Sequence, residues 1–137
     1  PQVNKSIRLF ILDASPYAEE DEKLEGLKRV FINPVILEEE GTEWDFKEGC
    51  LSIPGIREDV SRKPRIVVEY YDESFNLHEE TYDGLAARII QHEYDHIEGV
   101  LFTDGINPFK RRLLKGKLND ITKGNVEVDY KMKFPKK

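Results

Sequence analysis

The amino-acid sequence predicts an α+β fold in which antiparallel strands are packed around a central helix, with a second helix near the C-terminus. Three observations indicate this class. Short apolar runs bounded by turn residues recur before position 83, as expected of strands. One long helical pattern then spans residues 83–99, and another begins at residue 107. The 137 residues, 39% hydrophobic and 35% charged, suffice for one globular domain with a single core.

The first strands are predicted from apolar runs and the residues that bound them. Residues 6–13, SIRLFILD, predict a buried strand. The acidic, turn-rich residues 15–26 predict an exposed loop. Residues 30–37 are mostly apolar but contain Asn33-Pro34. Because proline lacks an amide donor, this strand is expected to lie at an edge or to be interrupted.

A hairpin and the central helix follow. Residues 65–71 and 76–82 flank the turn Asp72-Glu73-Ser74-Phe75 and predict two antiparallel strands. Asp83 is then a candidate N-cap and Gly99 a candidate stop for the helix GLAARIIQHEYDHIE between them.

A second helix and a last strand are predicted at the C-terminal end. Asn107 is expected to cap this helix, Pro108 to occupy its first position and Gly124 to end it, although Gly116 interrupts the pattern. The following residues alternate strictly between apolar and polar, which predicts a strand. Its apolar face would carry Val126, Val128, Tyr130, Met132 and Phe134.

Charge is unevenly distributed along the chain. The net charge is −6, yet residues 107–137 hold ten Lys and Arg against three acidic residues, a local excess of +7. This basic end is either a solvated segment or a contact for a polyanion such as RNA. No apolar run reaches the ~18–20 residues of a bilayer span. The single cysteine fits a reducing compartment, so the cytoplasm is the expected location.

The central helix carries an H-E-x-x-H motif at residues 92–96. Side chains four residues apart lie on one helix face, so His92 and His96 can reach one metal ion. At ~100° per residue, both fall within ~20° of Leu85, and Glu93 lies ~80° away, on or beside the apolar arc. The opposite side would carry Arg88, Gln91, Asp95 and Glu98. A buried glutamate between inward histidines is costly unless a cation compensates, which favours a metal site over an ordinary helix.

The remaining ligand is open at this point. A catalytic zinc-type site usually has three protein ligands and a water, so a carboxylate or Cys50 is needed beside the histidines. Cys50 follows Gly49, which permits a close backbone approach. A lone cysteine is also commonly a small buried apolar residue, and spacing alone does not decide between these roles.

Two motifs closely resemble those of peptide deformylase. They are E-G-C-L-S at residues 48–52 and Q-H-E-Y-D-H at residues 91–96. The family's glycine-rich motif, G-x-G-x-A-A-x-Q, is represented only by its last two positions, Pro1-Gln2. The resemblance therefore implies one deformylase-like catalytic domain over residues 1–137, N-terminally incomplete.

The resemblance also implies a role for each matching residue. Cys50, His92 and His96 would hold one divalent metal, and Glu93 would be the general acid/base. Gln2 and the backbone N–H of Leu51 would stabilise the oxyanion. Gly49, Leu51 and Ile89 would line the pocket for the substrate's methionine. Arg57 and Asp95 would position the substrate or support the ligands.

The implied reaction removes the formyl group from the N-terminal formyl-methionine of newly synthesised proteins, by attack of metal-bound hydroxide. Fe²⁺ would be the native ion, and Zn²⁺ or Ni²⁺ can substitute. The basic residues 110–137 would contact the ribosome, from which the substrate emerges. Two other classes stay open: a general zinc endopeptidase, and a catalytically silent metal- or RNA-binding module.

Overall fold

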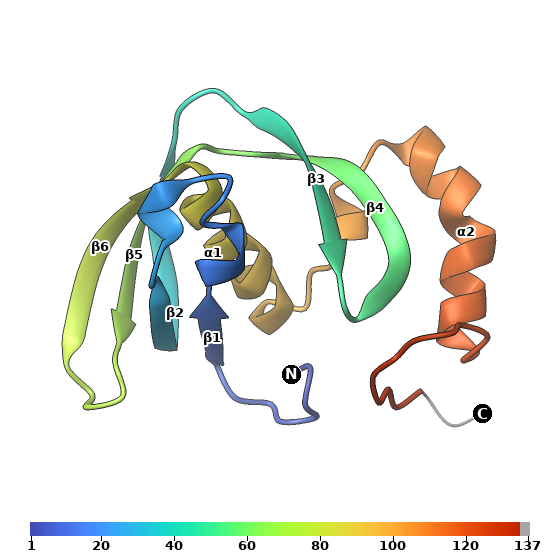
Figure 1. The fold of residues 1–137 in the computed structure, drawn as a ribbon, viewed down its shortest axis with the longest axis horizontal. Helices are drawn as coiled ribbons and strands as arrows, with labels where there is room; N and C mark the ends of the chain where they lie inside the picture. The colour runs from blue at the N-terminus through green and yellow to red at the C-terminus, as the bar shows by residue number, and fades with distance from the viewer. Residues whose placement is uncertain (135–137) are drawn as a thin grey trace. The chain divides into compact units, whose positions relative to one another are not determined.

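The computed structural model describes residues 1–134, which form two compact units (Figure 1). The first comprises residues 1–44 and 62–101, and the second comprises residues 45–61 and the chain from residue 102 onward. Antiparallel strand pairing together with two α-helices confirms the predicted α+β class. Among the described residues, no helix combines the length and the apolar character needed to cross a membrane.

The first unit is built on a four-stranded antiparallel sheet in the order β1-β2-β5-β6. Its strands are β1 (Leu9–Asp13), β2 (Lys28–Glu40), β5 (Arg65–Tyr71) and β6 (Leu77–Asp83). Helix α1 (Gly84–Ile97) packs beside this sheet (Figure 1). Their shared core includes Phe31, Ile66 and Val68 from strands and Ala87 and Ile90 from α1, all fully buried. Burial of this apolar surface fixes α1 against the sheet.

Strand β2 corrects one expectation and confirms another. It pairs with β1 on one side and β5 on the other, so it is not an edge strand. It is interrupted, because its register with β5 shifts between Ile32 and Val35. Pro34 falls inside this irregularity, and Asn33 before it has a φ of 48°. A bulge releases Pro34 from a ladder bond that it cannot donate, which is how an interior strand tolerates it.

The loop at residues 15–26 is not wholly exposed, contrary to expectation. It contains two short 3-10 turns, Ser15–Tyr17 and Glu22–Leu24. The Asp21 side chain accepts a hydrogen bond from the Lys23 N–H at 3.0 Å and caps the second turn. That turn places Leu24 in the core with no exposed surface. One apolar side chain thus ties an otherwise acidic loop to the sheet.

The predicted hairpin and central helix are confirmed. Strands β5 and β6 pair from Tyr71 with Leu77 to Arg65 with Asp83. Helix α1 follows at once, with Asp83 at the N-cap position, although its side chain makes no capping bond. Gly99, just beyond the helix, has a φ of 75°, the left-handed conformation in which glycine commonly ends helices.

The second unit contains α2 (Pro108–Thr122) and all but one end residue of each of the strands β3 (Trp44–Cys50) and β4 (Ile53–Arg62). The two strands pair with each other and are joined by two residues. These two strands have no clear alternating pattern in the sequence and were not predicted from it. A separate core forms from apolar residues of β4, the 3-10 turn Phe102–Asp104 and α2. Its members include Ile53, Ile56, Val60, Phe102 and Ile106, with Leu114, Leu118 and Ile121 packed against them.

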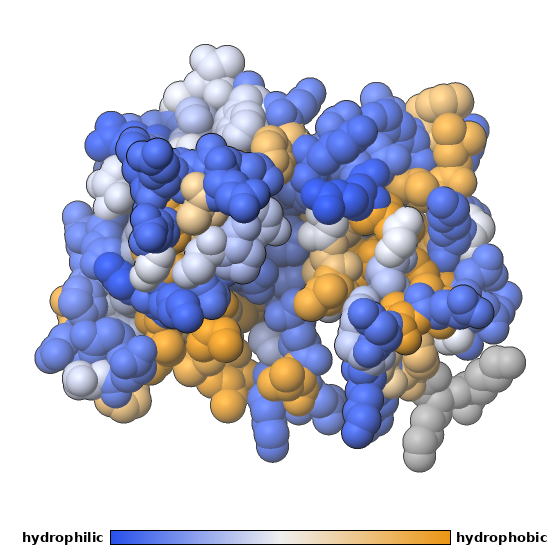
Figure 2. All heavy atoms as spheres, viewed as in Figure 1, coloured by the Kyte–Doolittle hydropathy of each residue, from blue (hydrophilic) through white to orange (hydrophobic). Residues whose placement is uncertain are grey.

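Helix α2 has the predicted ends. The Asn107 side chain accepts a hydrogen bond from the Phe109 N–H at 2.8 Å, and Pro108 occupies the first turn. Gly124, with a φ of 80°, follows the helix. Apolar surface lies over the start of α2 (Figure 2), where Phe109 and Leu113 are exposed.

Residues 126–134 form no strand, so that prediction is wrong. Burial still alternates along this segment: the odd-numbered residues from 127 to 133 are exposed, and the even-numbered ones are half-buried. A period of two therefore reports an extended segment lying on a surface, whereas a strand also requires a neighbouring backbone to pair with.

Candidate metal centre

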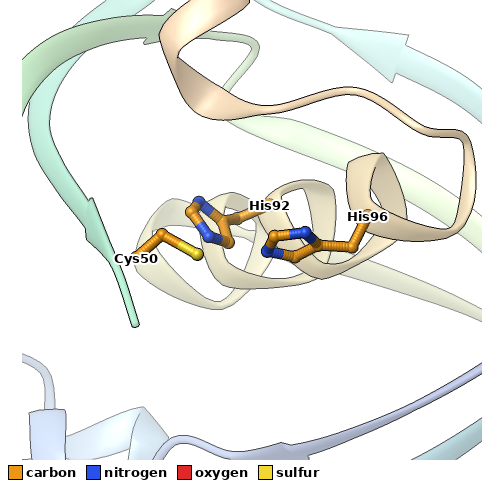
Figure 3. Close-up of side chains that lie close together, drawn as sticks. All are labelled: Cys50, His92 and His96. Carbon is orange, nitrogen blue, oxygen red and sulfur yellow. The ribbon is translucent and has the colours of Figure 1, made fainter. Parts of the chain in front are cut away.

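The two histidines of the H-E-x-x-H motif lie side by side on α1. His92 and His96 occupy successive turns, and Figure 3 shows both rings extending from the same side of the helix. Their ring centroids are 5.1 Å apart, at an angle of 73°. Both are half-buried, as is Glu93 between them. The first core fixes α1, so both imidazoles are presented from a rigid element.

The polar residues expected on the solvent side of α1 are not all there. Arg88 is 2% exposed and Gln91 5% exposed, which contradicts the helical-wheel expectation. The Arg88 guanidinium lies over the Trp44 ring at 4.3 Å and donates to the Trp44 carbonyl at 2.6 Å. Gln91 donates to the carbonyls of Lys63 and Ala87 at 3.0 and 3.1 Å. Arg88 and Gln91 can therefore be buried because their side chains donate hydrogen bonds to backbone carbonyls that pack against this side of the helix.

Asp95 is also turned toward protein. Its carboxylate pairs with Arg62 at 2.8 Å, and the side chains are 26% and 8% exposed. Arg62 is the last residue of β4 and had no recognisable signal in the sequence. The pair therefore holds the α1 turn that lies between the two histidines.

Gln2 lies close to the second histidine. Its amide nitrogen is 3.2 Å from the His96 Nε2. A hydrogen bond from the Asn4 N–H to the Pro1 carbonyl, at 2.9 Å, closes a turn around it. Of the residues expected in the site, the structure therefore brings Gln2 to the same face of α1 as the histidines.

Cys50 ends β3 and is half-buried against the second core. A Cβ added at Gly49 would meet the Arg57 Cγ at 3.3 Å and the Ile56 carbonyl at 3.5 Å. Glycine at position 49 thus permits the close approach that the sequence suggested.

The neighbours of Cys50 expected to bind substrate are mostly exposed. Leu51, in the β3–β4 turn, is 73% exposed, and its carbonyl accepts a hydrogen bond from the Tyr130 hydroxyl at 2.7 Å. Arg57 is exposed, whereas Ile89 on α1 is half-buried against the first core.

Among the described residues, one set of three His, Cys or acidic side chains could hold a metal ion: Cys50, His92 and His96, drawn in Figure 3. One thiolate and two imidazoles fit a divalent transition metal, and three protein ligands leave a position for water. His78, the third histidine, is outside this set and bonds to Asp72 at 2.7 Å.

Comparison with known proteins decides the family. The family model for polypeptide deformylase matches residues 1–112 of the chain. The chain belongs to the polypeptide deformylase family. Members of this family are enzymes, and the E-G-C-L-S and Q-H-E-Y-D-H motifs both lie within the matched residues.

Deformylase relatives cover nearly the whole chain. The peptide deformylase of Christiangramia forsetii is 56% identical over 142 residues, which span 98% of this chain and 72% of that protein. The one from Flavobacterium psychrophilum is 57% identical over 145 residues, spanning 100% of this chain and 75% of that protein.

Solved deformylase structures share the fold. A Plasmodium falciparum peptide deformylase aligns with a TM-score of 0.79 at 36% identity, covering 90% of this chain and 70% of that one. Arabidopsis thaliana peptide deformylase 1B aligns with a TM-score of 0.79 at 34% identity, covering 91% of this chain and 66% of that one. The chain thus spans about two thirds to three quarters of these relatives.

Proposed function

We propose that this chain removes the formyl group from the N-terminal formyl-methionine of newly synthesised proteins. The observation that carries the proposal is the deformylase family match across residues 1–112. It is supported by the neighbouring His92 and His96 rings on α1, with Glu93 between them in the sequence.

One divalent metal is held by Cys50, His92 and His96 in this proposal. When bound, such an ion supplies a water of lowered pKa as nucleophile near neutral pH. Ferrous iron is the proposed native ion, and Zn²⁺ or Ni²⁺ can take its place, because a thiolate and two imidazoles suit all three.

The chain's own residues then move a proton and stabilise charge. Glu93 accepts the proton of the attacking water and passes it to the leaving amine. The Gln2 amide and the Leu51 N–H donate to the oxyanion that develops on the formyl oxygen, where one such donor is typically worth about 3–4 kcal/mol. Gly49, Leu51 and Ile89 line the methionine pocket, and Arg57 positions the peptide.

The deciding experiment measures formate release from a formyl-methionyl tripeptide by the metal-loaded chain. The same tripeptide without the formyl group is the matched substrate control. Formate release with intact peptide bonds supports the proposal. Cleavage of a peptide bond in the unformylated tripeptide would indicate an endopeptidase instead. No turnover of either substrate would contradict both activities and favour a silent binding module.

Glu93→Gln tests the proton-transfer role. The variant is expected to keep its metal and to release formate at least ~10²-fold more slowly, the low end for general acid/base catalysis. Glu98→Gln, which changes an exposed carboxylate at the end of the same helix, is the control. Turnover near the wild-type value in Glu93→Gln would assign proton transfer to another group.

Cys50→Ala tests the ligand set through metal content alone. About one metal per chain is expected in the wild type, and the variant should lose it because two imidazoles bind less tightly than three ligands. His78→Ala, which removes the histidine outside the set, should retain the metal. A full metal complement in Cys50→Ala would remove Cys50 from the site.

The proposed partners follow from the substrate. Nascent formyl-methionyl chains are made by ribosomes, which supports the proposed cytoplasmic location and gives the basic residues 110–137 a polyanionic partner. Lys136 and Lys137 of this stretch lie outside the described residues.

A further inference from the structure

The C-terminal segment, defined here as residues 124–134, lies against the second unit with one side only. Val126, Val128, Tyr130 and Met132 are half-buried, while the residues between them are exposed. Because the segment is not paired as a strand, its place is set by side-chain contacts instead of a backbone ladder.

One contact fixes the far end of this segment. A Cβ built on Gly124 would lie 3.2 Å from the Phe134 Cδ2 and 3.4 Å from its Cγ, so the Phe134 ring rests directly on the glycine. Gly124 also has a φ of 80°, which other residues adopt only with strain. This glycine both ends α2 and makes room for the ring, which closes the segment into a loop.

The other contact reaches the turn between β3 and β4. The Tyr130 hydroxyl donates to the Leu51 carbonyl at 2.7 Å, across 79 positions of sequence. Leu51 is 73% exposed, so its own side chain does little to hold the turn by packing. A hydrogen bond from a tethered phenol supplies that restraint instead.

The restraint acts on the atoms next to the proposed chemistry. Peptide planes are rigid, so the Leu51 N–H and its carbonyl are related by only two rotations at the Leu51 Cα. The peptide that carries the Leu51 N–H also carries the carbonyl carbon of Cys50. Fixing the Leu51 carbonyl therefore limits how far both the N–H and the preceding residue can turn.

We propose that Tyr130 is a positioning residue for deformylation: its hydroxyl holds the Leu51 carbonyl so that the Leu51 N–H and the Cys50 thiol keep one orientation. The inference rests on the proposed function, in which the Leu51 N–H donates to the oxyanion and the Cys50 thiol binds the metal. Such groups act only when oriented in advance of the transition state, so losing the restraint lowers kcat and leaves substrate binding unchanged.

Tyr130→Phe in the metal-loaded chain is the test, with Tyr17→Phe as control because Tyr17 is an exposed tyrosine of the first unit. Two experiments are done: hydrogen exchange of the amides at residues 51–53, and steady-state kinetics that give kcat and KM for a formyl-methionyl tripeptide. Loss of one exposed hydrogen bond predicts about fivefold faster exchange and about fivefold lower kcat, with unchanged KM. Tyr17→Phe should change none of them.

The outcomes separate this inference from the proposed function. Unchanged exchange at residues 51–53 in Tyr130→Phe would overturn the restraint. Faster exchange with an unchanged kcat, or a loss confined to KM, would overturn its link to catalysis. A wild-type chain that releases no formate would refute the proposed function and with it the catalytic link, while exchange would still decide whether Tyr130 orders the turn.

Discussion

Asp95 and Arg62 show how a single ion pair can stabilise α1, the helix that carries the H-E-x-x-H motif. Their side chains meet at 2.8 Å with little exposure, 26% for Asp95 and 8% for Arg62. A second pair on the same helix, Glu98 with Arg8 at 2.7 Å, is 40% and 43% exposed. Solvent screens the second pair strongly and the first one less, so equal distances do not imply equal energies.

Asp95→Asn is expected to lower the free energy of unfolding by about 1–3 kcal/mol, because the buried Arg62 loses a charged acceptor. Glu98→Gln is expected to cost under about 1 kcal/mol, as for exposed pairs. Urea denaturation of the metal-loaded variants measures both values. Equal losses in the two variants would show that burial does not set the strength of the Arg62 pair.

Local spacing determined how many site residues the sequence revealed. His92, Glu93 and His96 are visible because their spacing is itself the signal. Arg62 and Tyr130 act through partners 33 and 79 positions away, which no local pattern encodes. The helical wheel failed for Arg88 and Gln91 because it assumes one buried side, and α1 has more than one.

At the scale of elements, Asp72 organises the turn between β5 and β6. Its carboxylate accepts hydrogen bonds from the N–H groups of Ser74 and Asn76 at 2.8 and 3.0 Å and contacts the His78 ring at 2.7 Å. These bonds lower the pKa of the Asp72 carboxyl below its usual value, and the bond with His78 has the largest effect. The charged form is thus stabilised by the folded turn.

This pKa shift predicts a pH dependence. A carboxyl whose folded pKa is depressed contributes stability above its unfolded pKa, near pH 4, and loses it as the pH falls through the folded value. Asp72→Asn should therefore destabilise the chain near neutral pH and make its unfolding less sensitive to acid below about pH 4. Urea denaturation across this range measures the effect, with Glu73→Gln in the same turn as control. A parallel loss at every pH would exclude the carboxyl as the titrating group.

Elements with their own local signals were predictable, and paired ones were less so. Helix α2 begins at the cap that Asn107 provides, and both helices end at glycines, because these signals depend on neighbouring residues. Asp83 marked the start of α1 correctly although its side chain makes no capping bond. Strands β3 and β4 were not predicted, because E-G-C-L-S-I-P-G resembles a loop in sequence. These residues form strands because β3 and β4 pair with each other, which no local pattern encodes. The strand predicted at residues 126–134 is wrong for the opposite reason. The segment has the alternation typical of a strand, but it does not pair with another strand.

At the scale of the whole molecule, we expect the fold to persist without the proposed metal. Both cores consist of apolar side chains, and neither His92 nor His96 belongs to them. Chelation is therefore expected to abolish formate release while circular dichroism of the helices is retained. Ferrous or nickel ions should restore activity and zinc should restore less, although zinc displaces ferrous iron readily. Equal activity of the zinc and iron forms at matched occupancy would contradict this order.

The basic C-terminal end contains cations of two kinds: some already pair with carboxylates of the chain, and others are exposed and can meet an external polyanion. Lys110 pairs with Glu58 at 3.2 Å and with Asp59 at 3.6 Å, which raises the pKa of its ammonium group. Arg111 pairs with Asp104 at 3.0 Å. Arg112, Lys115, Lys117 and Lys123 are exposed, and the described residues give them no ion pair. Between residues 107 and 124, these four are the cations best placed to meet an external polyanion.

Replacing Arg112, Lys115, Lys117 and Lys123 with glutamine is therefore expected to weaken ribosome binding more than replacing Lys110 and Arg111. Each phosphate contact contributes about 0.7–0.9 to the slope of log affinity against log salt, so the fourfold variant should lower that slope by up to about 3. Co-sedimentation with ribosomes across a salt series measures it, and formate release from a short formyl-peptide should not change in either variant. Cations already neutralised by Glu58, Asp59 and Asp104 release fewer counterions on binding, which is why the paired set is the matched control. If both sets leave co-sedimentation unaltered, the basic end only solvates the chain, and an effect confined to the Lys110 and Arg111 variant would place the contact surface at the start of α2.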